Sequence, residues 1–131
     1  MTRKLVGTGT EWESSVGYSR AVRVDDRVLV AGTTATDADG EVVAAGDPYR
    51  QTTVALDNVE AALEEAGASL ADVVRTRMYV TDIDRWEAYG RAHGERFVDI
   101  RPVTSMVEVS RLIDPAMMIE IEAEAVRGST D

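Results

Sequence analysis

Residues Phe97–Val126 read FVDIRPVTSMVEVSRLIDPAMMIEIEAEAV, and their pattern says most about the fold of this chain. Apolar and polar side chains alternate twice in this stretch, once after Pro102 and again after Pro115. An alternation with a period of two predicts a β-strand that packs one face on a core. In the second run, every residue on the polar face between positions 120 and 124 is a glutamate. A charged sheet face of this kind is solvated, paired with cations, or part of a site.

Length and composition are those of an ordinary globular domain. The chain has 131 residues, of which 44% are hydrophobic and 29% charged, so we expect one domain over residues 1–131. The N-terminal segment lacks the apolar run of a signal peptide, and no apolar stretch approaches the length of a membrane span. We therefore expect a cytoplasmic protein that does not contact a membrane. Cysteine is absent, which excludes disulfides, thiol catalysis and thiolate metal sites.

The charge balance bears on the kind of partner. A net charge of −10 argues against nucleic acid, because phosphate binding needs a concentrated basic surface. Asp37, Asp39 and Glu41 weakly resemble a calcium loop, but the twelve-residue spacing of such loops is missing. We expect this segment to be a solvated turn, and we expect neither a metal nor a cofactor.

The segments before Phe97 predict three strands and two helices. A two-aspartate turn is expected to join the first two strands into a hairpin. An Asp-Pro pair opens the first helix well, and a glycine ends it in the left-handed conformation. The predicted elements are strands at Tyr18–Val24 and Arg27–Thr33, a helix from Asp47-Pro48 to Gly67, a strand at Val73–Val80, and a second helix capped by Asp84.

Two further expectations concern the tryptophans and the N-terminal segment. Residues 1–17 contain three glycines and are predicted to be irregular, with Trp12 anchoring them to the body. In the second helix, Trp86, Tyr89 and Phe97 are spaced to face inward, together with Ala92 or His93.

This order of elements predicts an α+β fold, a mixed sheet with both helices on one face. The other sheet face would then be bare. By alternation it would carry Arg75, Arg77, Glu108, Glu120 and Glu122. Mixed charges on an uncovered sheet predict partial burial against other copies of the chain, and hence an oligomer.

Several segments, in the same order along the chain, resemble the RidA/YjgF family of reactive-intermediate (enamine/imine) deaminases. The matching segments are Gly17-Tyr18-Ser19, Val30–Thr33, Gln51–Gly67, Val73–Asp82, Arg101-Pro102 with the following TSMVEVSRL, and Ile119–Ala125. The resemblance implies a chorismate-mutase-like fold assembled as a homotrimer, with the bare sheets forming an inner barrel. It also implies a small-molecule ligand bound at the subunit interfaces.

The resemblance also implies site residues. Those that this chain retains are Tyr18, Gly32, Ser105 and Glu120, and in the family this glutamate positions water for attack on the imine carbon. Thr104 stands where the deaminases have the arginine that holds the substrate carboxylate. A hydroxyl cannot reproduce the bidentate, charge-assisted grip of a guanidinium, so we expect typical amino-acid-derived imines to be poor substrates.

Two more family positions differ, because Ala31 replaces a serine and Gly90 replaces an asparagine. Arg75 or Arg77 could supply the missing cation, or could instead neutralise the glutamates. Thr104 and Ser105 could bind a neutral or phosphorylated ligand, or could bond only to the backbone. A nucleophilic Ser105–His93 dyad would need an oxyanion hole that the sequence does not indicate.

Three functions follow from these observations. The first is a RidA-like hydrolase that acts on an enamine, an imine or a related small metabolite, with Glu120 positioning the water. The second is a trimer that binds a small ligand without catalysis. The third is the endoribonuclease or translation-inhibitor activity with which members of the family have been associated, and the acidic charge argues against it.

Overall fold

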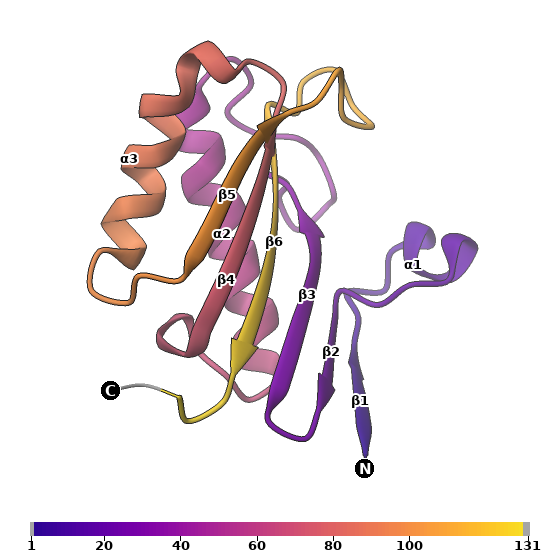
Figure 1. Cartoon of the computed structure of the whole chain (residues 1–131). Helices are drawn as coiled ribbons and strands as arrows, with labels where there is room; N and C mark the ends of the chain where they lie inside the picture. Colours follow the sequence, from indigo (N-terminus) through magenta and orange to yellow (C-terminus); the bar gives the residue numbers. More distant parts are fainter. Residues whose placement is uncertain (1, 130–131) are drawn as a thin grey trace.

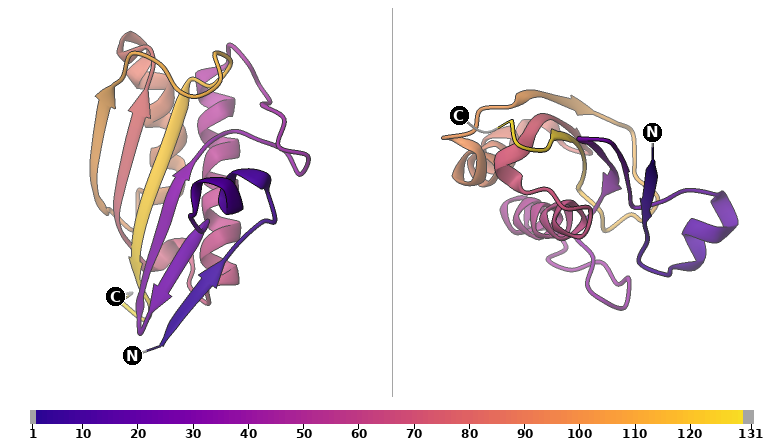
Figure 2. Two further views of the ribbon diagram at one scale, coloured as in Figure 1. Left: turned by 90° about the vertical axis from the view of Figure 1, so that its right-hand side faces the viewer. Right: turned by 90° about the horizontal axis from the view of Figure 1, so that it is seen from below.

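The computed structural model describes residues 2–129 and contains a six-stranded mixed sheet in the order β1-β2-β3-β6-β4-β5. The two long helices, α2 and α3, lie side by side on one face of this sheet, as Figures 1 and 2 show. The predicted α+β class and the placement of both helices on one face are confirmed. The elements are β1 Arg3–Val6, α1 Glu11–Val16, β2 Ala21–Val24, β3 Arg27–Thr33, α2 Pro48–Glu65, β4 Val73–Val80, α3 Trp86–Phe97, β5 Val103–Glu108 and β6 Ile119–Val126, with short 3₁₀ turns at Leu70–Asp72 and Ile83–Arg85.

The sheet is antiparallel except at one edge. Strand β4 pairs in parallel with β5, and α3 makes the crossover between them. The last strand, β6, inserts between β3 and β4 and pairs antiparallel with both. The two strands predicted from Phe97–Val126 therefore flank β4 and do not pair with each other. This arrangement places the glutamate row of β6 near the middle of the sheet.

Helix α2 forms as its sequence predicts. The Asp47 side chain accepts a hydrogen bond from the Arg50 backbone N–H at 3.0 Å, and Pro48 occupies the first turn. Gly67 follows the helix with a φ of +89°, a conformation that glycine adopts at little cost. Leu56 and Leu63 are fully buried against the sheet.

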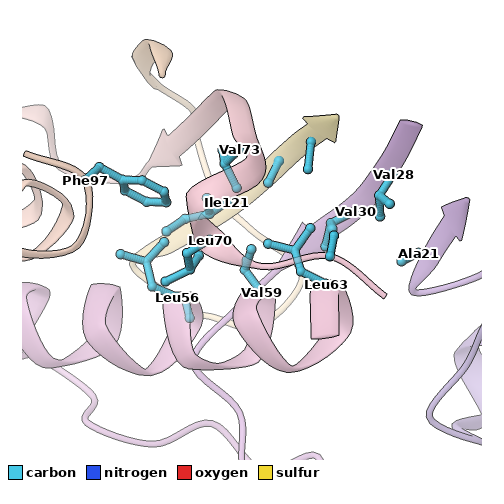
Figure 3. Packing of buried hydrophobic residues seen from close by; sticks show 14 of the residues in the cluster. Ala21, Val28, Val30, Leu56, Val59, Leu63, Leu70, Val73, Phe97 and Ile121 are labelled. Carbon is cyan, nitrogen blue, oxygen red and sulfur yellow. The ribbon is translucent and has the colours of Figure 1, made fainter. Parts of the chain in front are cut away.

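The hydrophobic core lies between the sheet and the two long helices. Figure 3 shows Leu56, Val59 and Leu63 of α2 facing the inward side chains of β3 and β6, among them Val30 and Ile121. Full burial of one such side chain contributes about 1.5–3 kcal/mol. Along β6, buried residues that face the core alternate strictly with half-buried residues of the other face, so the core fixes which face the glutamates occupy.

The N-terminal segment differs from the prediction. Residues 1–17 were expected to be irregular, but Arg3–Val6 forms an edge strand on β2, and Glu11–Val16 forms a short helix. The strand has only four residues and is held by backbone pairing. Its sequence is therefore too short to show the alternation from which a strand is predicted. Trp12 is 59% exposed, so its predicted role as an anchor is wrong.

The start of α3 also differs. The Asp82 side chain, and not that of Asp84, accepts the capping hydrogen bond, which the Asp84 backbone N–H donates at 3.2 Å. A 3₁₀ turn inserted before α3 moves the cap two residues upstream. Trp86 is 56% exposed, whereas Tyr89 and Phe97 are buried as predicted. Trp86 lies at the first position of α3, before the helix packs on the core.

One predicted member of the bare face lies elsewhere. Glu108 pairs in register with Val80, whose side chain is buried under the helices, so Glu108 belongs to the covered side. Its carboxylate accepts a hydrogen bond from the Ile83 backbone N–H at 3.0 Å. Register between parallel strands depends on the crossover, which the alternation within one strand does not reveal.

Within residues 2–129, no helix is both long enough and apolar enough to span a membrane.

Candidate functional site

A bulge between β3 and β6 brings the Glu120 side chain against the main chain of β3. Val30 is opposite Ala123, but Thr33 is opposite Ile121, so β3 contains an extra residue between these pairs. A Cβ atom on Gly32 would lie 2.5 Å from Oε2 of Glu120. Only a glycine leaves room for the carboxylate in this position.

The Glu120 carboxyl group is half-buried on the uncovered face of the sheet. Burial raises its pKa, the negative charge of Glu122 raises it further, and the Arg20 guanidinium acts in the opposite direction. Within the described residues, no cation lies within ion-pair distance of Glu120. A carboxylate with these properties is suited to accept a proton or to orient a water molecule.

The Arg20 side chain lies beside this carboxylate and was missed by the sequence analysis. Its Nη2 donates a hydrogen bond to the Gly32 carbonyl oxygen at 2.7 Å. Its guanidinium carbon lies 5.5 Å from the centre of the Tyr18 ring. Both residues belong to the predicted strand Tyr18–Val24, in which positions two apart would share a face, and this is the signal that could have identified Arg20. In the structure the strand begins later, at Ala21, so Tyr18 and Arg20 lie in the segment before β2.

Most other polar groups of the bare face pair among themselves, whereas Arg75 has no ion pair within the described residues. Tyr79 donates a hydrogen bond to Oε1 of Glu122 at 2.5 Å, and this bond, with burial and the carboxylate charge, raises the pKa of Tyr79. Arg77 and Arg27 lie 3.5 Å and 3.7 Å from the Glu124 carboxylate oxygens. The alternative in which Arg77 neutralises a glutamate therefore holds for Glu124 and not for Glu120.

Thr104 and Ser105 lie two strands away from Glu120, on the edge strand β5. Oγ1 of Thr104 is 2.9 Å from Oγ1 of Thr76, which is 2.8 Å from Nε2 of His93. This chain of polar groups lies on the helix-covered side of the sheet. Ser105 is in register with Arg77 and so lies on the uncovered side, which separates it from His93.

One chain thus assembles only part of the predicted site. Tyr18, Gly32 and Glu120 come together around Arg20, whereas Thr104 and Ser105 do not join them. Burial lowers the pKa of His93 to about 4, which keeps the imidazole neutral near pH 7. In the described part of the chain, no three histidine, aspartate or glutamate side chains cluster as a metal site would require.

The fold and the site together define a class of protein. It is an α+β domain that covers one face of a mixed sheet with two helices and keeps a half-buried glutamate on the other face. The family model described as "Endoribonuclease L-PSP" matches residues 8–127. The chain belongs to this family, which includes the RutC and YjgF/UK114 proteins.

Individual relatives agree with this assignment. An uncharacterised protein of Streptomyces coelicolor is 43% identical over 128 residues, which cover 98% of this chain and 95% of that protein. A RutC family protein of Pyrococcus abyssi is 37% identical over 84% of this chain and 86% of its own length. The crystal structure of Rv2704 from Mycobacterium tuberculosis, a member of the YjgF/YER057c/UK114 family, superposes with a TM-score of 0.87. Its sequence is 54% identical, and the match covers 95% of this chain and 99% of that one.

Proposed function

We propose that this protein hydrolyses the C=N bond of a small enamine or imine, with Glu120 as the residue that positions and activates water. The observation that carries the proposal is the half-buried Glu120 carboxylate, which lies against Gly32 and has no ion-pair partner among residues 2–129. Burial raises the pKa of this carboxyl group, and a carboxylate with a raised pKa is a better general base than an ordinary surface glutamate.

The proposed reaction consumes one water molecule and releases ammonia or an amine. An enamine first tautomerises to the imine, and water then adds to the imine carbon while Glu120 accepts one of its protons. The imine nitrogen takes up a proton from solvent in the same addition. In the resulting carbinolamine the C–N bond breaks, the nitrogen leaves as ammonia or an amine, and the hydroxyl group releases its proton to solvent as the C=O bond of the carbonyl product forms. Glu120 returns its proton to the departing nitrogen, so the enzyme is regenerated.

We further propose that the site is completed by a second copy of the chain in a homotrimer. Strand β5, which carries Thr104 and Ser105, would then lie beside the Glu120 region of a neighbouring subunit, with Ser105 on the face turned toward it. Exposed apolar side chains on the uncovered face support association, since Leu29, Val103 and Val107 are 42%, 60% and 46% exposed. With Thr104 in place of an arginine, the ligand would not be gripped by a guanidinium at that position.

The test compares Glu120→Gln with Glu124→Gln, which removes a carboxylate of the same strand face that already pairs with Arg27 and Arg77. Purified protein is assayed for carbonyl and ammonia release from a panel of enamines and imines generated in solution. We expect Glu120→Gln to reduce turnover by about 10²-fold or more, the range for loss of a general base, and Glu124→Gln to retain it. Equal turnover by Glu120→Gln and the native chain on every active substrate would exclude the mechanism.

Two parallel measurements address the rival functions and the assembly. Thermal stabilisation by panel compounds without turnover would favour a protein that only binds the ligand. RNA cleavage that persists through purification and disappears in Glu120→Gln would favour the endoribonuclease activity. Light scattering gives the mass in solution, and a single-chain mass would exclude the trimer.

A further inference from the structure

Four parts of the fold face Glu120, and two of them contribute a charge. On β6 itself, Glu122 is the nearest carboxylate in sequence on the same face. On β4, Tyr79 pairs in register with Glu120, and its hydroxyl is engaged by Glu122. Across the bulge, β3 offers only the backbone of Gly32. The segment before β2 contributes Arg20, whose positive charge acts on Glu120.

Of the other cations on the same face, Arg77 and Arg27 are engaged by a carboxylate, whereas Arg75 has no ion pair within the described residues and is in register with Glu124, not with Glu120. Arg77 and Arg27 both lie within 4 Å of the Glu124 carboxylate. Arg20 has no such partner within the described residues, and its Nε is buried without a hydrogen bond. Arg20 is therefore the cation whose charge is directed at Glu120 and is not neutralised by another carboxylate.

The position of this guanidinium is defined by the same residue that accommodates the carboxylate. The Gly32 carbonyl oxygen accepts from Nη2 of Arg20 at 2.7 Å, while the missing side chain of Gly32 leaves space for Glu120. The Tyr18 ring lies under the guanidinium at 5.5 Å. One glycine thus binds the cation through its carbonyl oxygen and leaves room for the carboxylate.

We propose that Arg20 is a positioning residue of the site, which acts through Glu120 by keeping this carboxylate ionised and directed at the bound water. Without a cation, a half-buried glutamate beside a second glutamate would take up a proton and lose its capacity to act as a base. The inference rests on the proposed function for its catalytic meaning, whereas the interaction between the two side chains can be tested without turnover.

The first experiment uses the native protein labelled with ¹³C in the glutamate carboxyl groups and ¹⁵N in arginine. The Glu120 carboxyl resonance is assigned by its loss in Glu120→Gln, and its titration midpoint is measured by NMR. We expect the Arg20 Nε resonance of the native protein to show an inflection at the same midpoint. An Arg20 signal that does not respond to the titration of Glu120 would overturn the proposal.

The second experiment compares three variants. Arg20→Gln should raise the Glu120 midpoint and move the acidic limb of the kcat/KM profile to higher pH. Arg20→Lys keeps the charge and should restore the midpoint toward the native value. Arg50→Gln removes one positive charge from an exposed position of α2 and should leave the midpoint unchanged.

The outcomes separate the two proposals. A raised midpoint in Arg20→Gln with rescue by Arg20→Lys supports the role of Arg20, even if no imine is hydrolysed and the proposed function fails. An unchanged midpoint in Arg20→Gln, or an equal rise in Arg50→Gln, overturns the role of Arg20 whatever the activity. If Arg20→Gln does not fold, the native-protein titration of Arg20 Nε still decides the question.

Discussion

Acid should destabilise this protein through one imidazole. His93 is 9% exposed, its Nε2 lies 2.8 Å from Oγ1 of Thr76, and its ring packs 4.6 Å from that of Phe97. Burial penalises the charged form and lowers the pKa of His93 from 6.5 to about 4. In the unfolded chain the imidazole recovers its ordinary affinity for protons.

The sign and size of the effect follow from this difference. Between pH 6.5 and pH 4 the unfolded chain binds a proton that the folded chain excludes, so stability falls as the pH is lowered through this window. The stability that comes from burying His93 in its neutral form is fully present above pH 6.5. It is lost progressively as the pH falls from 6.5 to about 4. The two pKa values correspond to a loss of about 3 kcal/mol at completion, and of ~2 kcal/mol between pH 7 and pH 5.

The assay is urea unfolding of the native chain and of His93→Gln at pH 7 and pH 5. Glutamine can keep a hydrogen bond to Thr76 but cannot be protonated in this range. Carboxylates titrate in both proteins, so the difference between their pH dependences isolates His93. Both proteins are studied at one chain concentration, because any oligomer makes stability concentration-dependent. Equal losses of stability in the two proteins would refute the reasoning.

Three further substitutions have defined expectations. Gly32→Ala places a Cβ against the Glu120 carboxylate and should displace it, which we expect to abolish turnover or ligand stabilisation while circular dichroism shows an intact fold; undiminished binding and turnover would contradict this. Leu63→Ala empties a fully buried position under the sheet and should lower the free energy of unfolding by about 2–5 kcal/mol, and a loss under 1 kcal/mol would indicate that the core closes over the gap. Asp47→Ala removes the N-cap of α2 and should cost ~1 kcal/mol in the same denaturation assay, with Asp47→Asn expected to retain most of it.

The regular elements were predictable because their signals are local. Alternation in Val103–Glu108 and Ile119–Val126 and the Asp-Pro start of α2 depend on neighbouring residues, and the structure confirms each of them. The edge strand Arg3–Val6 gave no such signal, since its stability comes from backbone pairing with β2. Trp12 and Trp86 were misplaced because hydrophobicity indicates that a side chain can be buried, and not that anything lies above it.

The candidate site also has a part that the sequence could predict and a part that it could not. Glu120 and Gly32 could be named from the chain through the resemblance to a family, but their contact depends on a bulge that shifts β3 against β6. Arg20 is marked in the sequence only by its spacing from Tyr18, and its position beside Glu120 arises from a hydrogen bond to a carbonyl twelve residues away. Side-chain periodicity depends on residues that are close together in the chain. The amino-acid sequence is therefore enough to predict the strands, the long helices and the side chains that face inward. Register, bulges and the charges around a carboxylate depend on atoms distant in the chain, and only packing in three dimensions brings those atoms together.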